Sequence, residues 1–90
     1  MAAPLFKLGK LVATPGALAA LTPEEPLILL SRHVSGDWGD VPAEDAAENE
    51  FSVERGFRIV TSYETASGTR VWIITEADRS STCILLPEEY

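Results

Sequence analysis

The clearest secondary-structure signal of the chain lies in residues 57–86, FRIVTSYETASGTRVWIITEADRSSTCILL. Apolar and β-branched residues alternate with polar ones over 57–65, and further apolar runs follow over 69–77 and from residue 82. The segments ASG (66–68) and DRSS (78–81) separate these runs with residues that favour turns. This pattern predicts three antiparallel strands joined by tight turns, a C-terminal β-meander that ends at Pro87.

The middle strand of this meander is apolar on both faces. Trp72 and Ile74 share one face, and Val71 and Ile73 share the other. A strand with one solvent-exposed face alternates between apolar and polar residues. Because this strand does not alternate, we expect it to be covered on both faces. We expect helices on one face and a second cover on the other, for which a partner protein is a candidate.

The N-terminal run LFKLGKLVA (5–13) also alternates and predicts a further strand. Lys10 interrupts its apolar face, which favours an edge position. Directly after it, Thr14 and Pro15 form the N-cap and first position of a short helix that runs to Leu21.

A second helix is predicted from the capping-box pattern of Thr22, Pro23 and Glu25 onward, with Pro26 in its first turn. Its expected buried face consists of Leu27, Leu30 and Val34, with Ile28 beside them. Gly36 offers a left-handed position where this helix ends. Arg32 and His33 fall in the last turn, where the helix dipole favours positive charge.

A third helix is predicted over residues 40–56, with Asp40 as its N-cap and Pro42 in its first turn. Its narrow apolar stripe would consist of Ala43, Ala46, Ala47 and Phe51, with Phe51 as the main contact. Arg55 and Gly56 would close it. Together, these patterns predict one α+β domain over residues 1–90, with three short helices packed on a three- to four-stranded antiparallel sheet.

The composition limits the possible classes of protein. Ninety residues, 46% of them hydrophobic, are enough for one modest core. No apolar run approaches the length of a transmembrane helix, and Met1–Pro4 lacks the basic region of a secretory signal. Cys83 is the single cysteine, so no internal disulfide can form. We expect a cytoplasmic protein that binds no membrane and needs no cofactor.

The chain is strongly acidic, with 14 acidic and 7 basic residues and a net charge of −7. Because phosphate contacts require a basic surface, this balance argues against direct binding of nucleic acid. The segment from Asp37 to Glu54 holds seven acidic residues and no basic one. It is either a solvated helix face or a surface that attracts a basic partner.

The segment SRHVSGDWGD (31–40) contains the only histidine and is the densest polar stretch. One hypothesis is a small enzyme or metal-dependent factor that uses His33, Asp37 and Asp40. The alternative is a corner between two helices, in which Asp37 forms an Asx-turn, Trp38 is buried and Gly39 takes an unusual φ. We favour the corner and predict no catalytic residue and no metal ligand.

A second polar stretch, TEADRSST (75–82), joins two predicted strands. Its simplest interpretation is a charged turn with an internal pair between Asp78 and Arg79. The alternative is a recognition loop beside the acidic helix. The chain also offers four large aromatic side chains to such a surface, although most are expected in the core: Trp38, Tyr63, Trp72 and Tyr90.

At SRHVSGDWGD and WIITEADRSSTCILLPEEY (72–90), the chain resembles small uncharacterised "plasmid-related" proteins of bacterial mobile elements. The similarity extends from KLVATPGALAAL (10–21) onward. Some members carry the label of a type I restriction methylase (M) subunit, but this chain has no Gly-rich adenosylmethionine loop and no Asn/Asp-Pro-Pro-aromatic motif. The resemblance implies an accessory or anti-defence role.

The sequence therefore predicts a non-catalytic protein-interaction module. Its partner would be a basic protein surface, such as the nucleic-acid-binding surface of a host defence nuclease, so that the module would be an anti-CRISPR or anti-restriction inhibitor. A self-associating accessory protein, monomer or homodimer, is a further alternative. The predicted partner-binding residues are Asp37, Trp38, Asp40, Glu44, Asp45, Glu48, Asp78 and Arg79.

Overall fold

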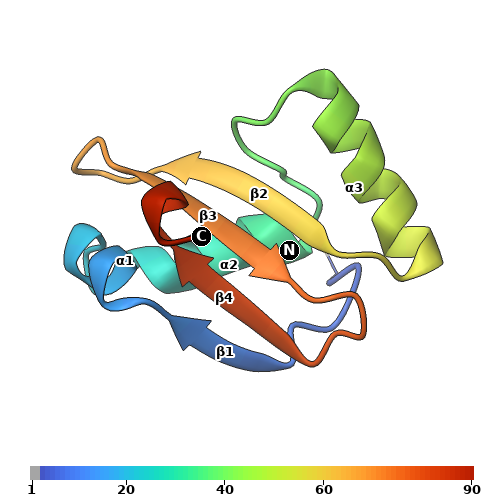
Figure 1. The fold of residues 1–90 in the computed structure, drawn as a ribbon, viewed down its shortest axis with the longest axis horizontal. Coiled ribbons are helices and arrows are strands. Elements are labelled where there is room, and N and C mark those ends of the chain that lie inside the picture. The colour runs from blue at the N-terminus through green and yellow to red at the C-terminus, as the bar shows by residue number, and fades with distance from the viewer. Residues whose placement is uncertain (1–2) are drawn as a thin grey trace.

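The computed structural model describes residues 3–90 (Figure 1). The expectation that Met1 and Ala2 begin no secretory signal falls partly outside these residues. The elements follow in the order β1 (Lys10–Ala13), α1 (Pro15–Ala20), α2 (Glu25–Val34), α3 (Ala43–Arg55), β2 (Ile59–Glu64), β3 (Arg70–Thr75), β4 (Ser81–Leu85) and the 3₁₀ turn η1 (Pro87–Glu89). The α+β class and the C-terminal meander are confirmed.

The four strands form one sheet in the order β1-β4-β3-β2. The strands β2, β3 and β4 are antiparallel neighbours, whereas β1 pairs with β4 in parallel. The prediction of a purely antiparallel sheet was therefore wrong. Three helices and two strands separate β1 from β4 along the chain, so no hairpin forces these two strands to run in opposite directions.

Strand β1 lies at the edge of the sheet, as predicted, but it is shorter than the alternating run that predicted it. Gly9, directly before β1, has a φ of +66°, which lies outside the extended region. A Cβ atom at Gly9 would lie 2.4 Å from the carbonyl oxygen of Arg79. Because of this close contact with the β3–β4 turn, the strand begins only at Lys10.

The helices α1 and α2 cover one face of the sheet, which is the far face in Figure 1. The Thr14 side chain accepts a hydrogen bond from the Ala17 N–H at 3.2 Å, so the predicted N-cap of α1 is confirmed. The core lies between these helices and the sheet. It consists of Ala17, Leu29, Leu30, Tyr63, Val71, Ile73 and Ile84.

Helix α2 begins at Glu25, and only half of its predicted capping box forms, because the Thr22 N–H donates to Glu25 Oε1 at 2.8 Å without a reciprocal side-chain cap. Its buried face is Leu29, Leu30 and His33, whereas Leu27 is 75% exposed and Ile28 is also exposed. The predicted face was right at Leu30 and wrong at Leu27 and Ile28, because the sequence pattern placed His33 in a charged last turn and not in the core. The buried hydrogen bonds of His33 turn the helix so that residues 29, 30 and 33 point inward.

The end of α2 was predicted correctly at Gly36, which has a φ of +93°. The Gly36 N–H bonds to the carbonyl oxygen of His33, and the Asp37 N–H bonds to that of Arg32. These two bonds form a Schellman motif. The motif turns the chain toward α3, which lies at the β2 edge of the sheet, opposite the β1 edge.

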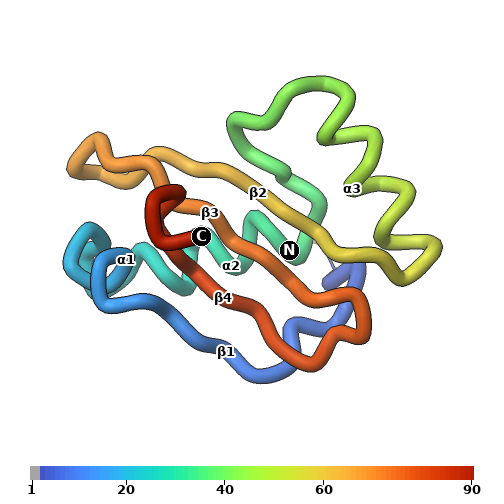
Figure 2. Tube along the Cα trace, viewed as in Figure 1, coloured from blue at the N-terminus to red at the C-terminus, as the bar shows by residue number. Residues whose placement is uncertain are grey.

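Helix α3 lies along the outer edge of β2 and not on a face of the sheet, as the trace in Figure 2 shows. Its predicted apolar stripe was wrong, because its buried residues are Asn49 and Ser52 and Phe51 is 46% exposed. A sheet edge presents unpaired backbone groups, which need a polar contact. Asn49 supplies it: Nδ2 donates to the Val60 carbonyl at 2.8 Å, and Oδ1 accepts from the Val60 N–H at 3.3 Å.

The ends of α3 match the prediction only in part. Gly56 takes the left-handed conformation at the C-terminus, with a φ of +78°, as predicted. Asp40 is not the N-cap, because Pro42 holds that position without a side-chain hydrogen bond. The Asp40 carboxylate accepts a hydrogen bond from Arg70 instead, at 2.8 Å.

Candidate binding groove

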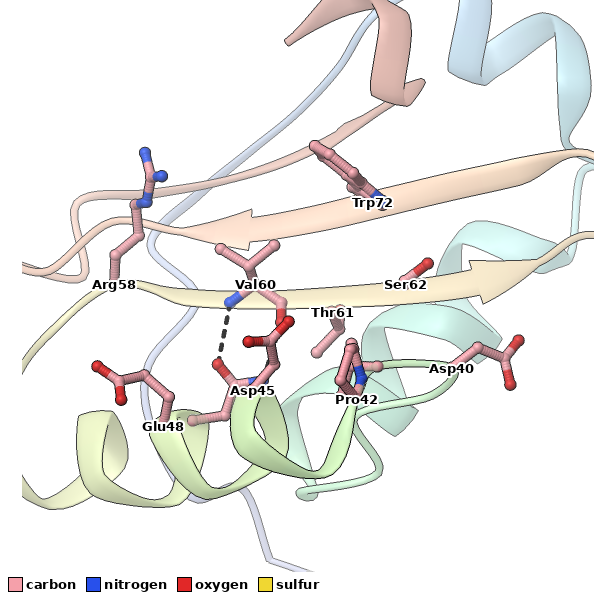
Figure 3. Close-up of a pocket in the computed structure, with 11 residues that line it drawn as sticks. Asp40, Pro42, Asp45, Glu48, Arg58, Val60, Thr61, Ser62 and Trp72 are labelled. Atoms are coloured by element: carbon pink, nitrogen blue, oxygen red, sulfur yellow. Dashed lines mark hydrogen bonds between the residues drawn. The ribbon is translucent and has the colours of Figure 1, made fainter.

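A groove of about 500 Å³ lies between α3 and the sheet face that α1 and α2 leave open (Figure 3). The residues that line it come from the loop before α3, from α3 itself and from the region of β2 and β3. Its lining residues are Asp40, Val41, Pro42, Asp45, Glu48, Asn49, Arg58, Val60, Thr61, Ser62 and Trp72.

The groove has an acidic wall and an apolar floor. Asp45 and Glu48 project from one side of α3, one helical turn apart, and both are exposed. Val60 on β2 and Trp72 on β3 form the floor, because residues that alternate on these strands share the open face. Figure 3 shows this arrangement. The groove therefore combines negative charge with an aromatic surface.

Two arginine side chains near the groove bond to other groups of the same chain. Arg70 pairs with Asp40 at 2.8 Å. Arg58 donates to the hydroxyl of Tyr90, and its guanidinium lies 5.4 Å from the centre of that ring. The Tyr90 ring in turn packs edge-on against Trp72. Within residues 3–90, no ion pair neutralises Asp45 or Glu48.

The three residues of the alternative hypothesis, an enzymatic or metal-dependent centre at the 31–40 corner, do not converge on one site. His33 is fully buried, with Nδ1 2.8 Å from Thr61 Oγ1 and Nε2 2.8 Å from Thr75 Oγ1. Burial lowers the pKa of His33 to about 4, and the charge of Arg79 contributes to this shift. The side chain is therefore neutral at pH 7, and Arg32 alone supplies the expected positive charge in the last turn of α2.

The two aspartates of this corner have other partners. Asp37 pairs with Arg32 at 2.6 Å, and this hydrogen bond lowers the pKa of the Asp37 carboxyl. Asp37 Oδ1 also accepts from the Gly39 N–H at 3.2 Å, which is the predicted Asx-turn. Asp40 pairs with Arg70. In the part of the chain that the structure describes, no group of three His, Cys, Asp or Glu residues could hold a metal ion.

Trp38 and Tyr63 belong to the packing of this corner. Trp38 is 6% exposed, stacks on Phe6 and donates its indole N–H to Glu50 Oε1 at 3.1 Å. Tyr63 is buried and donates its hydroxyl to the carbonyl oxygen of Asp37 at 2.5 Å. Burial raises the pKa of Tyr63 to about 12. Trp72 is therefore the aromatic residue that a ligand in the groove would meet.

The Asp78–Arg79 pair that the sequence predicted does not form. Asp78 Oδ1 accepts from the Ser80 N–H at 3.0 Å. The Arg79 guanidinium donates to the backbone carbonyls of Phe57 at 2.7 Å and Ser52 at 2.9 Å. Arg79 thus fastens the β3–β4 turn to the C-terminal end of α3, which places this turn beside the acidic helix.

The sequence identified part of the groove. Asp40, Asp45 and Glu48 meet there, whereas Glu44 lies on α3 outside the lining. The lining also excludes the other four predicted residues, Asp37, Trp38, Asp78 and Arg79. Arg58 and Val60 were not predicted as groove residues. Their alternation with the buried residues Ile59 and Thr61 was a signal in the sequence that could have placed them on the open face of the sheet.

The fold and the groove define the class: an α+β domain in which an acidic helix flanks an open sheet face. No family model, no curated protein and no solved structure matches the chain. None of the helices in residues 3–90 is long and apolar enough to cross a membrane.

Proposed function

We propose that this protein is a non-catalytic interaction module that binds a basic segment of a partner protein in the groove between α3 and the sheet. The observation that carries this proposal is the combination of unpaired Asp45 and Glu48 with the Trp72 floor. An arginine or lysine side chain in the groove would face carboxylates on one side and an aromatic ring on the other.

The charge balance of the chain supports an external partner. Arg32 and Arg70 form ion pairs with Asp37 and Asp40, and Arg58 and Arg79 donate to neutral groups of the chain, the Tyr90 hydroxyl and backbone carbonyls. The acidic residues of α3 outnumber the bases around them, so their field extends into solvent. A basic surface would be attracted at long range and then held by the groove.

The resemblance to proteins of mobile elements suggests which basic surface this is. We propose the nucleic-acid-binding surface of a host defence nuclease, either a CRISPR effector or a restriction enzyme. The acidic wall of α3 would take the place of nucleic acid phosphates and mask that surface. The protein would then act as an anti-CRISPR or anti-restriction inhibitor in the cytoplasm.

The test measures DNA binding by a panel of purified CRISPR effectors and restriction enzymes, with and without this protein. At least one nuclease should lose DNA affinity, and the triple variant Glu44→Lys, Asp45→Lys and Glu48→Lys should restore it. The matched control reverses Glu24, Glu76 and Glu88, which are exposed and lie outside the groove. Each reversal changes the charge by two, so both triple variants carry −1 instead of −7.

The control variant should still inhibit. Equal loss of inhibition in both triple variants would show that net charge, and not the groove, is responsible. Inhibition that survives reversal of the α3 residues would contradict the proposal. A panel in which no nuclease loses DNA affinity would contradict the defence role.

A further inference from the structure

The free edge of β1 has no role in the function proposed above. In the parallel pair with β4, the Lys10 N–H bonds to Ser80 O and the Thr14 N–H bonds to Ile84 O. Residues 10, 12 and 14 therefore direct their backbone groups toward β4, because these groups alternate in a strand. Leu11 and Ala13 direct theirs away from the sheet, where no strand within residues 3–90 pairs with them.

The side chains at this edge are apolar and exposed. Leu11 is 54% exposed, Val12 is 41% exposed and Leu18 on α1 is 56% exposed. A groove of about 290 Å³ lies beside them, and it is lined by Leu11, Val12, Ala13, Leu18, Leu30, Thr82 and Ile84. Lys10 is the single charged residue of β1, and the apolar residues 11–13 that follow it can pair with another strand.

This edge is complementary to itself. If a second β1 lies antiparallel with Val12 opposite Val12, then Leu11 of each copy lies opposite Ala13 of the other. These are the residues whose backbone groups point outward, so both pairs are hydrogen-bonded pairs. Opposite side chains share a face, which places each Leu11 over the small Ala13 side chain and into the neighbouring groove.

The charges agree with the same register. Lys10 then lies opposite Thr14 of the other copy, whose hydroxyl donates to Glu89. Each Lys10 ammonium therefore faces a carboxylate of the second copy. No like charges oppose each other along β1, although the whole chain carries −7. Pairing through β1 would therefore bring opposite charges of the two copies together, despite the net negative charge of each copy.

We propose that two copies of this chain form a symmetric dimer through β1, with one continuous sheet crossing both copies. The α3 groove lies at the far edge of each sheet, beside β2. The dimer would therefore present two grooves at its two ends. The inference is independent of the partner proposed above, because it rests on β1 alone.

A cysteine cross-link tests the register directly. Val12 is opposite itself as a non-hydrogen-bonded pair, in which the Cα atoms lie about 4.5 Å apart, within the range of a disulfide. The variant Val12→Cys in a Cys83→Ser background should form a covalent dimer under mild oxidation. The control Ile28→Cys in the same background should form no covalent dimer, because Ile28 is exposed on α2 outside the edge groove.

Sedimentation of the uncross-linked protein tests the association itself. The native chain should sediment as a dimer, and Leu11→Glu should convert it to a monomer with an unchanged circular dichroism spectrum. The matched control Ile28→Glu, at 56% exposure against 54% for Leu11, should remain dimeric. A native chain that is monomeric at every concentration overturns the proposal. A dimer that Leu11→Glu leaves intact overturns it as well.

Discussion

At the scale of single residues, the chain of buried hydroxyls around His33 has a defined direction. Thr82 Oγ1 donates to the Leu8 carbonyl at 2.7 Å, so its own oxygen must accept from Thr75 Oγ1, 2.7 Å away. Thr75 has then used its proton and must accept from His33 Nε2. Nδ1 is left to accept from Thr61. The Thr61 hydroxyl also lies 3.4 Å from the Ile73 carbonyl, a longer contact than its 2.8 Å to Nδ1. For a neutral imidazole, the Nε2–H tautomer is therefore the one that satisfies the hydroxyl chain.

The first prediction is that His33 is the neutral Nε2–H tautomer. Because the chain has one histidine, a ¹⁵N–¹H correlation spectrum of the imidazole reports on His33 alone. The Nε2 resonance should have the character of a protonated nitrogen and Nδ1 that of an unprotonated one. The Nδ1–H tautomer at pH 7 would contradict the direction of the hydroxyl chain.

The second prediction concerns the pH dependence of stability. The folded protein protonates His33 near pH 4, whereas the unfolded chain does so near pH 6.5. Between these values only the unfolded state binds the proton, so the free energy of unfolding falls as the pH is lowered from about 6.5 toward 4. The full loss is about 3 kcal/mol.

Urea denaturation at pH 7, 6 and 5 measures this slope. The other groups with shifted pKa values in acid are carboxyls, such as Asp37, whose pKa is lowered from 3.8. They contribute mainly below pH 4.5, where protonation of their unfolded forms begins. The variant His33→Gln should lose the slope between pH 6.5 and 5. A native chain equally stable at pH 7 and pH 5 would contradict the burial of a neutral His33.

At the scale of elements, two glycines with positive φ flank α3, Gly39 before it and Gly56 at its C-terminus, and their surroundings differ. Gly39 and Gly56 have φ values of +74° and +78°. A Cβ at Gly39 would lie 2.1 Å from the Ser62 carbonyl oxygen and 2.6 Å from the Tyr63 ring, whereas a Cβ at Gly56 would meet nothing within 4 Å. The backbone strain is alike at both sites, but only Gly39 lacks space.

The third prediction compares alanine at these two sites. Gly56→Ala should lower the free energy of unfolding by about 1 kcal/mol, the cost of a left-handed alanine. Gly39→Ala should cost about 3 kcal/mol or more, because the loop must also move away from β2. Chemical denaturation measures both. Equal losses would show that the loop does not press against β2 as described.

The same elements show what the sequence could and could not predict. The meander and the ends at Thr14, Gly36 and Gly56 depend on local signals, which the pattern carries. The buried side of α3 was missed because Asn49 meets the edge of β2, a tertiary contact that overrides the apolar stripe. The parallel β1–β4 pair joins distant segments, so no local signal encodes it.

For the candidate site, the sequence identified the acidic helix but not the surface it faces. Asp45 and Glu48 stood out because the segment lacks basic residues. Trp72 was correctly placed on one face of the middle strand, but its place in the groove depends on where α3 lies, which the sequence pattern does not encode. Asp40 was assigned to a helix cap, and only the fold brings it to Arg70.

At the scale of the whole molecule, the two candidate surfaces lie at opposite edges of one sheet. The α3 groove beside β2 is acidic, and the β1 edge is apolar with a lysine. If both proposals hold, the dimer offers two acidic grooves, and a partner with two basic sites gains affinity from their linkage. The central claim is that the groove, rather than the net charge, selects the basic partner.

The measurement that tests this claim most directly is a titration of ¹⁵N-labelled protein with a short arginine-rich peptide. The shifts should concentrate on Val60, Ser62 and the Trp72 indole N–H. The variant Asp45→Lys/Glu48→Lys should lose at least tenfold in affinity. The control Glu44→Lys/Glu54→Lys, with the same charge on the same helix, should lose much less, because neither residue lines the groove. Equal losses in the two variants, or shifts spread evenly over the acidic surface, would contradict the account.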